Sequence, residues 1–153
     1  MANSIPAHMI NEVMSCSSNV IEPKVGMLGT YFVGSDRYAI AVAKVITNKK
    51  IFVIDVNSEA LENKTIDNNG IEWISDEYIT EYLNKHTPNE EVCKRMYGDD
   101  YKPEYLENEL EYFYNSETYS LRKNGRWVHI GEGLWACGSI HLGVADPYID
   151  PCF

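Results

Sequence analysis

The chain has 153 residues, a net charge of −10 and an apolar fraction of 44%. These values are typical of one globular domain and argue against disorder of the whole chain. The acidic balance argues against a free-standing nucleic-acid binder, because Lys and Arg make the contacts to phosphate.

The cysteines and the start of the chain bear on its location. The four cysteines, at positions 16, 93, 137 and 152, form no CxxC pair. The first ten residues lack the basic start and apolar run of a signal peptide, and no apolar run is long enough to span a membrane. We therefore expect an intracellular protein with reduced thiols, neither secreted nor embedded in a membrane.

The first half of the chain is predicted to be rich in β-structure. Residues 1–24 are expected to form an N-terminal leader with a short helix that Ser4 would cap. Extended segments are then predicted over 25–33, 38–46, 51–56 and 71–74. Tight turns separate them, and Asp67-Asn-Asn-Gly70 is the strongest of these turns.

The two central strands differ in their side-chain patterns. Large side chains at 38, 40, 42 and 46 alternate with alanines at 39, 41 and 43, which predicts two unlike faces. Residues 51–56 are apolar and rich in branched side chains, as in a strand that is buried on both faces.

A three-helix insertion is predicted over 76–117, where the apolar period lengthens. Ser75 would cap the first helix. Thr87 matches a capping box followed by proline, and Gly98 would end that second helix. Pro103 would begin the third helix.

The side chains of this insertion are predicted to divide into two faces. The inner face would hold Val92, Met96, Leu106, Leu110 and Phe113, and the outer face Glu104, Glu107 and Glu111. The insertion has twelve acidic and four basic residues, so it carries −8 of the total −10 and leaves −2 for the rest. Such a segment is suited to a basic partner protein.

The clearest local pattern lies in residues 119–130, around Asn124-Gly125. This pair favours a two-residue type I′ turn, because both central positions need a positive φ. The turn would place Arg122 opposite Trp127. The core face would then hold Tyr119, Leu121, Val128 and Ile130, and the opposite face Ser120, Arg122, Trp127 and His129.

The chain is predicted to end in a strand and a tail. The strand covers 134–144, and residues 145–153 form an extended tail that two prolines stiffen. The apolar Phe153 at its end would pack on the same body or on a second copy. An exchanged tail is a low-cost way to form a homo-oligomer, which we expect here.

These elements predict one α+β domain over residues 1–153. Its β body, residues 25–75 and 118–144, would be a small β-barrel or a curled antiparallel sheet, with an SH3-like barrel as one option. The acidic helical segment, residues 76–117, would be an insertion into that body.

Five segments follow one another along the chain in a distinctive order: Val25-Gly-Met-Leu-Gly-Thr30, Ser35-Asp-Arg-Tyr38, Asp67-Asn-Asn-Gly70, Leu121-Arg-Lys-Asn-Gly-Arg-Trp127 and Leu142 to Phe153. Their pattern resembles a family of short uncharacterised proteins from bacteriophages and marseillevirus-type giant DNA viruses. Two departures are the long acidic insertion and Ala145, where the family carries arginine. The resemblance implies a viral origin, in the infected cell or the virion, and implies no catalytic activity.

Residues that could support catalysis or metal binding are scattered. Cys137 and His141 lie four apart on one strand, roughly 13 Å, too far to share one ion. A metal site would also need His129 and Cys152, and half-buried thiols and imidazoles explain these residues better. A catalytic dyad of Cys137 with His129 or His141, and a carboxylate pair within Glu104–Glu111, are likewise disfavoured. We predict no catalytic residue, no metal and no cofactor.

The charged and aromatic residues near the predicted turn form the candidate interaction site: Arg122, Lys123, Arg126, Trp127 and His129. The favoured interpretation is that the insertion or the leader covers this face. A protein partner comes second, because Arg and Trp are common interface anchors. Stacking on single-stranded nucleic acid comes third.

Three functional hypotheses follow. The first is a non-enzymatic viral accessory protein that acts through protein–protein contacts, with a basic partner for the insertion and self-association through the tail. The second is a small β-barrel that binds single-stranded nucleic acid. The third is an unrecognised enzyme.

Overall fold

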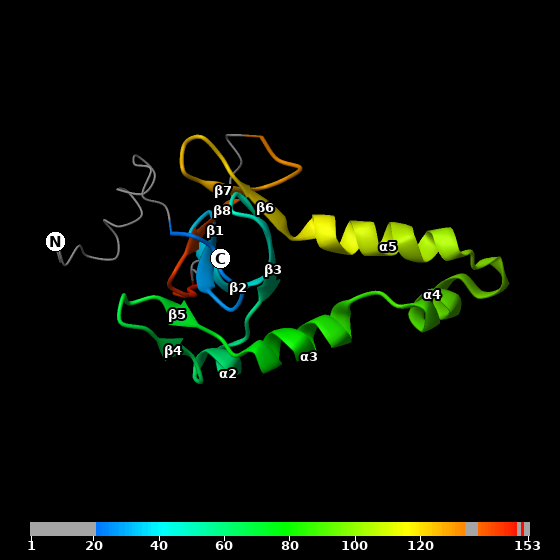
Figure 1. Cartoon of the computed structure of the whole chain (residues 1–153), viewed down its shortest axis with the longest axis horizontal. Helices are drawn as coiled ribbons and strands as arrows, with labels where there is room; N and C mark the ends of the chain where they lie inside the picture. Colours follow the sequence, from blue (N-terminus) through cyan, green and yellow to red (C-terminus); the bar gives the residue numbers. More distant parts are fainter. Residues whose placement is uncertain (1–20, 134–137, 150, 152–153) are drawn as a thin grey trace.

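Six antiparallel strands close into a barrel in this computed structural model, which describes residues 21–133, 138–149 and 151 (Figure 1). In barrel order the strands are β1 (Leu28–Val33), β2 (Asp36–Thr47), β3 (Lys50–Asp55), β6 (Thr118–Leu121), β7 (Trp127–His129) and β8 (Gly138–Leu142). The pairing of β8 with β1 closes the ring and leaves no open edge. The predicted α+β fold with a small β-barrel and inserted helices is confirmed.

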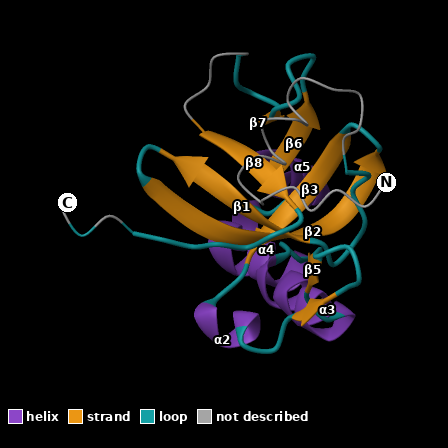
Figure 2. Cartoon of the chain, turned by 90° about the vertical axis from the view of Figure 1, so that its left-hand side faces the viewer, coloured by secondary structure: helices purple, strands orange, loops and turns teal. Residues whose placement is uncertain are grey.

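Helices and a small two-stranded sheet connect β3 to β6 outside the barrel (Figure 2). They are α2 (Ser58–Leu61), β4 (Thr65–Ile66), β5 (Glu72–Trp73), α3 (Asp76–His86), α4 (Glu90–Tyr97), the 3₁₀ turn η1 (Gly98–Asp100) and α5 (Pro103–Ser116). β4 and β5 form a separate two-stranded sheet. The predicted turn between them is present, and Gly70 adopts a φ of 81° there.

The barrel strands contribute to two cores. Every strand supplies the inner core, through Tyr31, Ile40, Ile51, Tyr119, Trp127 and Ile140. The outer core lies under the helices, where Phe52 and Ile54 pack with Ile79 and Phe113. The predictions that β3 is buried on both faces, and that the alanines of β2 share one face, are confirmed.

A β-bulge changes the faces of β2 near its end. The pairing of β2 with β3 shifts between Val42 and Lys44, which inserts one residue into β2. Val45 therefore packs against the inner core, whereas Ile46 is 45% exposed. The prediction that Ile46 continues the face of Ile40 and Val42 is wrong for this reason.

The predicted helix boundaries hold at three of four positions. Ser75 caps α3, Gly98 ends α4 and Pro103 begins α5. The start of α4 differs, because the Asn89 side chain accepts the Val92 N–H at 2.9 Å. Thr87 instead ends α3, where its N–H donates to a carbonyl of the last helical turn.

The hairpin between β6 and β7 forms in a register one residue from the predicted one. Leu121 pairs with Trp127, whereas the type I′ turn would place Arg122 there. Because side chains alternate, this shift moves Trp127 to the face of Tyr119 and Leu121, inside the barrel. Val128, predicted on that face, lies on the opposite one. The predicted register and the outward position of Trp127 are wrong.

A three-residue loop explains the shift. Among the described residues only glycines have a positive φ, and Gly125 does so at 82°, so Asn124 does not adopt the type I′ conformation. The Gly125 N–H donates to the Arg122 carbonyl at 2.9 Å, and the Asn124 side chain accepts the Arg126 N–H at 3.1 Å. A turn followed by a left-handed glycine is the usual three-residue hairpin loop.

Candidate functional site

Arg122 holds its own hairpin together. Its Nε donates to the Ser120 hydroxyl at 2.9 Å. One terminal nitrogen donates to the carbonyls of His129 at 3.1 Å and Glu132 at 2.9 Å. The guanidinium therefore fixes the loop after β7 and makes no stack on Trp127, which lies inside the barrel and is 3% exposed.

His129 joins β7 to the end of α5. Its Nε2 lies 2.9 Å from the Asn115 carbonyl and 3.0 Å from the Ser116 carbonyl, and its Nδ1 accepts the Gly131 N–H at 3.1 Å. Carbonyls can only accept, so this arrangement assigns the imidazole proton to Nε2. His129 thus satisfies carbonyls that α5 leaves open at its C-terminal end.

The predicted site residues do not form one surface. Lys123 is exposed at the hairpin turn, and Arg126 is half-buried. The positive charge of Arg126 acts on His141, whose pKa is lowered first by burial and then by this guanidinium. The nucleic-acid hypothesis loses its stacking residue, because Trp127 lies inside the barrel. Phe153, the remaining predicted site residue, lies outside the described residues.

The insertion forms a helical arm, which we define as residues 76–117. Figure 1 shows α3 and α5 on one side of the barrel and α4 at the far end of the arm. At the base of the arm, Phe52 of the barrel contacts the rings of Phe113 and Tyr114 at centroid distances of 5.6 and 5.1 Å. These aromatic contacts fix α5 to the outer core.

The far end of the arm has its own small packing unit. The rings of Tyr97 and Tyr105 lie 4.6 Å apart, and the Tyr97 hydroxyl donates to Glu109 at 2.9 Å. That hydrogen bond raises the pKa of Tyr97. Cys93 is buried here at 1% exposure. The packing face of α4 therefore contains Cys93, not the predicted pair of Val92 and Met96.

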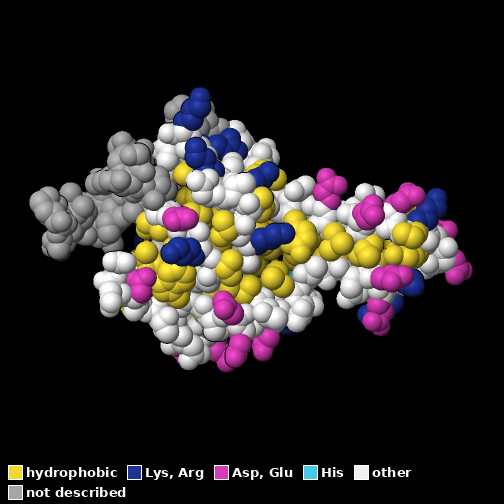
Figure 3. Space-filling model, in the orientation of Figure 1, with side chains coloured by type: hydrophobic (Ala, Val, Ile, Leu, Met, Phe, Trp, Pro, Cys, Tyr) yellow, Lys and Arg dark blue, Asp and Glu magenta, His cyan; other side chains and the backbone are white. Residues whose placement is uncertain are grey.

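Large apolar side chains remain exposed on the acidic arm. Met96 is 63% exposed, Tyr112 74% and Val92 38%. In Figure 3 hydrophobic side chains form a band along α5, with acidic side chains at its edges. No local pattern points to Tyr112, because a residue that directly follows the outward Glu111 lies about 100° away from it around the helix.

The start of the tail pairs with its own barrel. Arg37 and Tyr148 exchange two backbone hydrogen bonds of 2.7 and 2.9 Å. The Arg37 side chain also forms an ion pair of 3.0 Å with Asp146 and lies 5.1 Å from the centre of the Tyr148 ring. The expected extended tail is therefore present up to residue 148.

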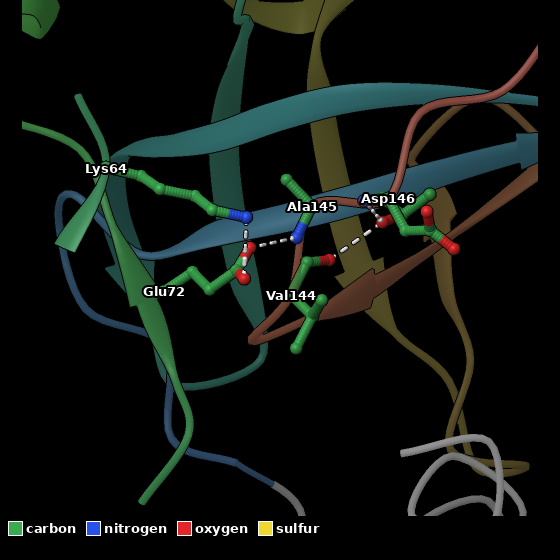
Figure 4. A network of polar contacts seen from close by, with 6 residues as sticks. Lys64, Glu72, Val144, Ala145 and Asp146 are labelled. Atoms are coloured by element: carbon green, nitrogen blue, oxygen red, sulfur yellow. Dashed lines mark hydrogen bonds and ion pairs between the residues drawn. The ribbon is translucent and has the colours of Figure 1, made fainter. Parts of the chain in front are cut away.

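A buried polar network anchors the tail where it begins, at Val144 and Ala145 (Figure 4). Glu72 accepts the Lys64 ammonium at 2.8 Å through one carboxylate oxygen and the Ala145 N–H at 3.0 Å through the other. The Thr30 hydroxyl donates to the Val144 carbonyl at 2.7 Å. Nothing in the sequence pattern pointed to Glu72, which begins β5 between the apolar Ile71 and Trp73.

Within residues 21–133, 138–149 and 151, no three His, Cys, Asp or Glu side chains are grouped so that they could hold a metal ion. Cys137 and Cys152 lie outside these ranges. None of the helices that the structure describes is both long enough and apolar enough to cross a membrane.

Comparisons of the chain with protein-family models, with curated proteins and with solved structures gave no match.

Proposed function

We propose that this chain is a non-enzymatic protein-binding module whose helical arm docks on a basic surface of another protein. The observation that carries the proposal is the exposure of Met96 and Tyr112, at 63% and 74%, on a segment with a charge of −8. Apolar side chains surrounded by charges on a projecting element are typical of a contact surface.

Charge and apolar area would serve different purposes in this contact. The acidic edges would attract a basic partner and orient it, which chiefly raises the association rate. Met96 and Tyr112 would lose water in the complex and so supply affinity. The barrel would serve as the rigid support that holds α5 in place through Phe52.

Self-association through the tail is a second part of the proposal. The backbone pairing of Arg37 with Tyr148 joins segments 111 positions apart in sequence. A tail from a second copy would make the same pairing, so an exchanged dimer needs no new contacts. From its resemblance to viral proteins, we propose that this module acts in the infected cell or the virion.

The test compares three forms of the protein in affinity capture from expressing cells: wild type, Met96→Gln with Tyr112→Gln, and the control Ile66→Gln. Ile66 is 61% exposed but lies in β4, away from the arm. Proteins bound by the wild type and the control should be lost from the arm variant. They should also elute when salt rises above about 0.3 M, where screening is strong.

A captured partner then allows a binding measurement. Removal of both apolar side chains should raise the dissociation constant at least about tenfold, as expected for central interface residues. If the arm variant keeps the same partners at the same affinity, the arm is not the contact surface. Light scattering at high micromolar concentration tests the tail, and a strictly monomeric protein contradicts the exchange.

A further inference from the structure

A cleft lies at the base of the helical arm. It has a volume of about 460 Å³ and runs between the end of β3 and α3. Its walls include Asp55, Tyr78, Glu81, Tyr82, Lys85 and His86. This volume is within the usual range for sites that take a small molecule or a side chain, roughly 300–1,000 Å³.

One wall of the cleft is a row of aromatic rings. Tyr78, Tyr82 and His86 are spaced four apart on α3 and therefore lie along one side of the helix. The ring centres of Tyr82 and His86 are 4.2 Å apart, and those of Tyr78 and Tyr82 are 6.4 Å apart. The three rings follow one another with interplanar angles of 36° and 37°.

Tyr78 fixes this wall to the barrel. Its hydroxyl donates to the Asp55 carbonyl at 3.1 Å and accepts the Asn57 N–H at 3.4 Å. Tyr82 is half-buried beside it. The rings are thus held before any ligand arrives, which lowers the entropy cost of binding.

Two carboxylates give the cleft negative charge, Asp55 at the end of β3 and Glu81 on α3 beside the aromatic row. Burial, and then the Asp55 carboxylate, raise the pKa of both Tyr82 and Glu117, so Asp55 acts on the space between α3 and α5. In the described part of the chain, neither Asp55 nor Glu81 belongs to an ion pair. Lys85 is exposed on the cleft wall one helical turn after Glu81.

We propose that this cleft receives an arginine side chain of the basic partner, an inference that rests on the proposed function. A guanidinium is planar, so it can stack on the Tyr82 ring while two of its N–H groups donate to the Asp55 carboxylate. The aromatic wall favours a cation, and the carboxylates disfavour an anionic ligand. A lysine ammonium fits less well, because it cannot stack and donate in parallel.

The test uses a probe that does not depend on finding the partner. N-acetyl-arginine amide is titrated into the full chain, and the aromatic ring signals of the tyrosines and histidines are followed by NMR. The signals of Tyr82 and His86 should shift, whereas those of Tyr112 at the arm surface should not. N-acetyl-citrulline amide, which has the same shape but no charge, should leave all of them unchanged.

Two variants that each remove one negative charge distinguish binding in the cleft from general attraction to the acidic arm. Asp55→Asn should weaken arginine binding at least about fivefold, because it removes the charged acceptor. Glu107→Gln, on the exposed face of α5, should change it less than about 1.5-fold, since it only alters a screened surface charge. Urea unfolding confirms that both variants are folded.

Three results would overturn the inference: equal shifts with arginine and citrulline, equal weakening by Asp55→Asn and Glu107→Gln, or no shift of the Tyr82 ring. The outcome is independent of the test of the arm. Arginine binding with unchanged capture by the Met96→Gln, Tyr112→Gln protein supports the cleft and contradicts the arm surface. Loss of capture without arginine binding supports the arm and contradicts the cleft.

Discussion

Glu72 should contribute more to stability than any exposed acidic residue of the arm. Its side chain is 9% exposed, and its two carboxylate oxygens accept from Lys64 at 2.8 Å and from the Ala145 N–H at 3.0 Å. Ala145 is itself only 6% exposed. Glu72→Ala therefore leaves a buried N–H without its acceptor and an ammonium without its partner.

The two losses can be estimated separately. A buried donor left without an acceptor costs about 1–3 kcal/mol. The ion pair adds about 1 kcal/mol, a reduced value because the Lys64 side chain is 30% exposed and can turn to water. We expect Glu72→Ala to lower the free energy of unfolding by about 2–4 kcal/mol in urea titrations.

A matched control is available on the arm. Glu91 faces Arg95 at 3.7 Å in a pair whose side chains are 83% and 72% exposed, so Glu91→Ala should cost less than about 0.5 kcal/mol. Amide hydrogen exchange gives a second readout. Exchange at Ala145 should accelerate at least about tenfold in Glu72→Ala and stay unchanged in Glu91→Ala. Equal unfolding free energies for the two variants, with Ala145 still protected, would refute this account of the network.

Three further perturbations test the barrel. Gly125→Ala should lower the unfolding free energy by about 1–2 kcal/mol, because alanine is strained at a φ of 82°; a cost equal to that of Gly133→Ala, which has open space around it, would contradict this. Trp127→Ala should cost about 3–5 kcal/mol in the same urea assay, since the ring fills the barrel, and a loss below about 1 kcal/mol would speak for an exposed ring. Burial, and then Arg126, lower the pKa of His141, so the unfolded chain takes up this proton at a higher pH than the folded chain. Stability should therefore fall as the pH drops from about 7 to 5, and the stability of His141→Phe should fall less steeply; parallel pH curves would count against this effect of the half-buried imidazole.

Local sequence patterns predicted most of the secondary structure. Ser75, Gly98 and Pro103 mark helix ends because capping and glycine conformations depend on a few neighbouring residues. Burial of β3 on both faces was likewise predictable, because a continuous apolar run is visible within a few neighbouring residues. Where several local solutions compete, the prediction failed, as at Thr87 and Asn89, which both match a helix start.

The candidate site was predictable only in part. The acidity of the arm follows from composition, and the outward glutamates of α5 follow from helical period. The exposure of Met96 does not, because it depends on which side of α4 meets α5. Packing around Cys93 rotates α4 by about one residue from the predicted face, roughly 100° on a helix.

The order of strands, turns and helices follows from local sequence, because period, caps and turn residues act over a few positions. The register of the last hairpin and the anchoring of the tail depend on packing between distant segments. Two- and three-residue loops at Asn124-Gly125 are both accessible locally, and closing the barrel with Trp127 inside selects one of them. The contact between Glu72 and Ala145 joins positions 73 apart, a distance at which no local pattern carries information.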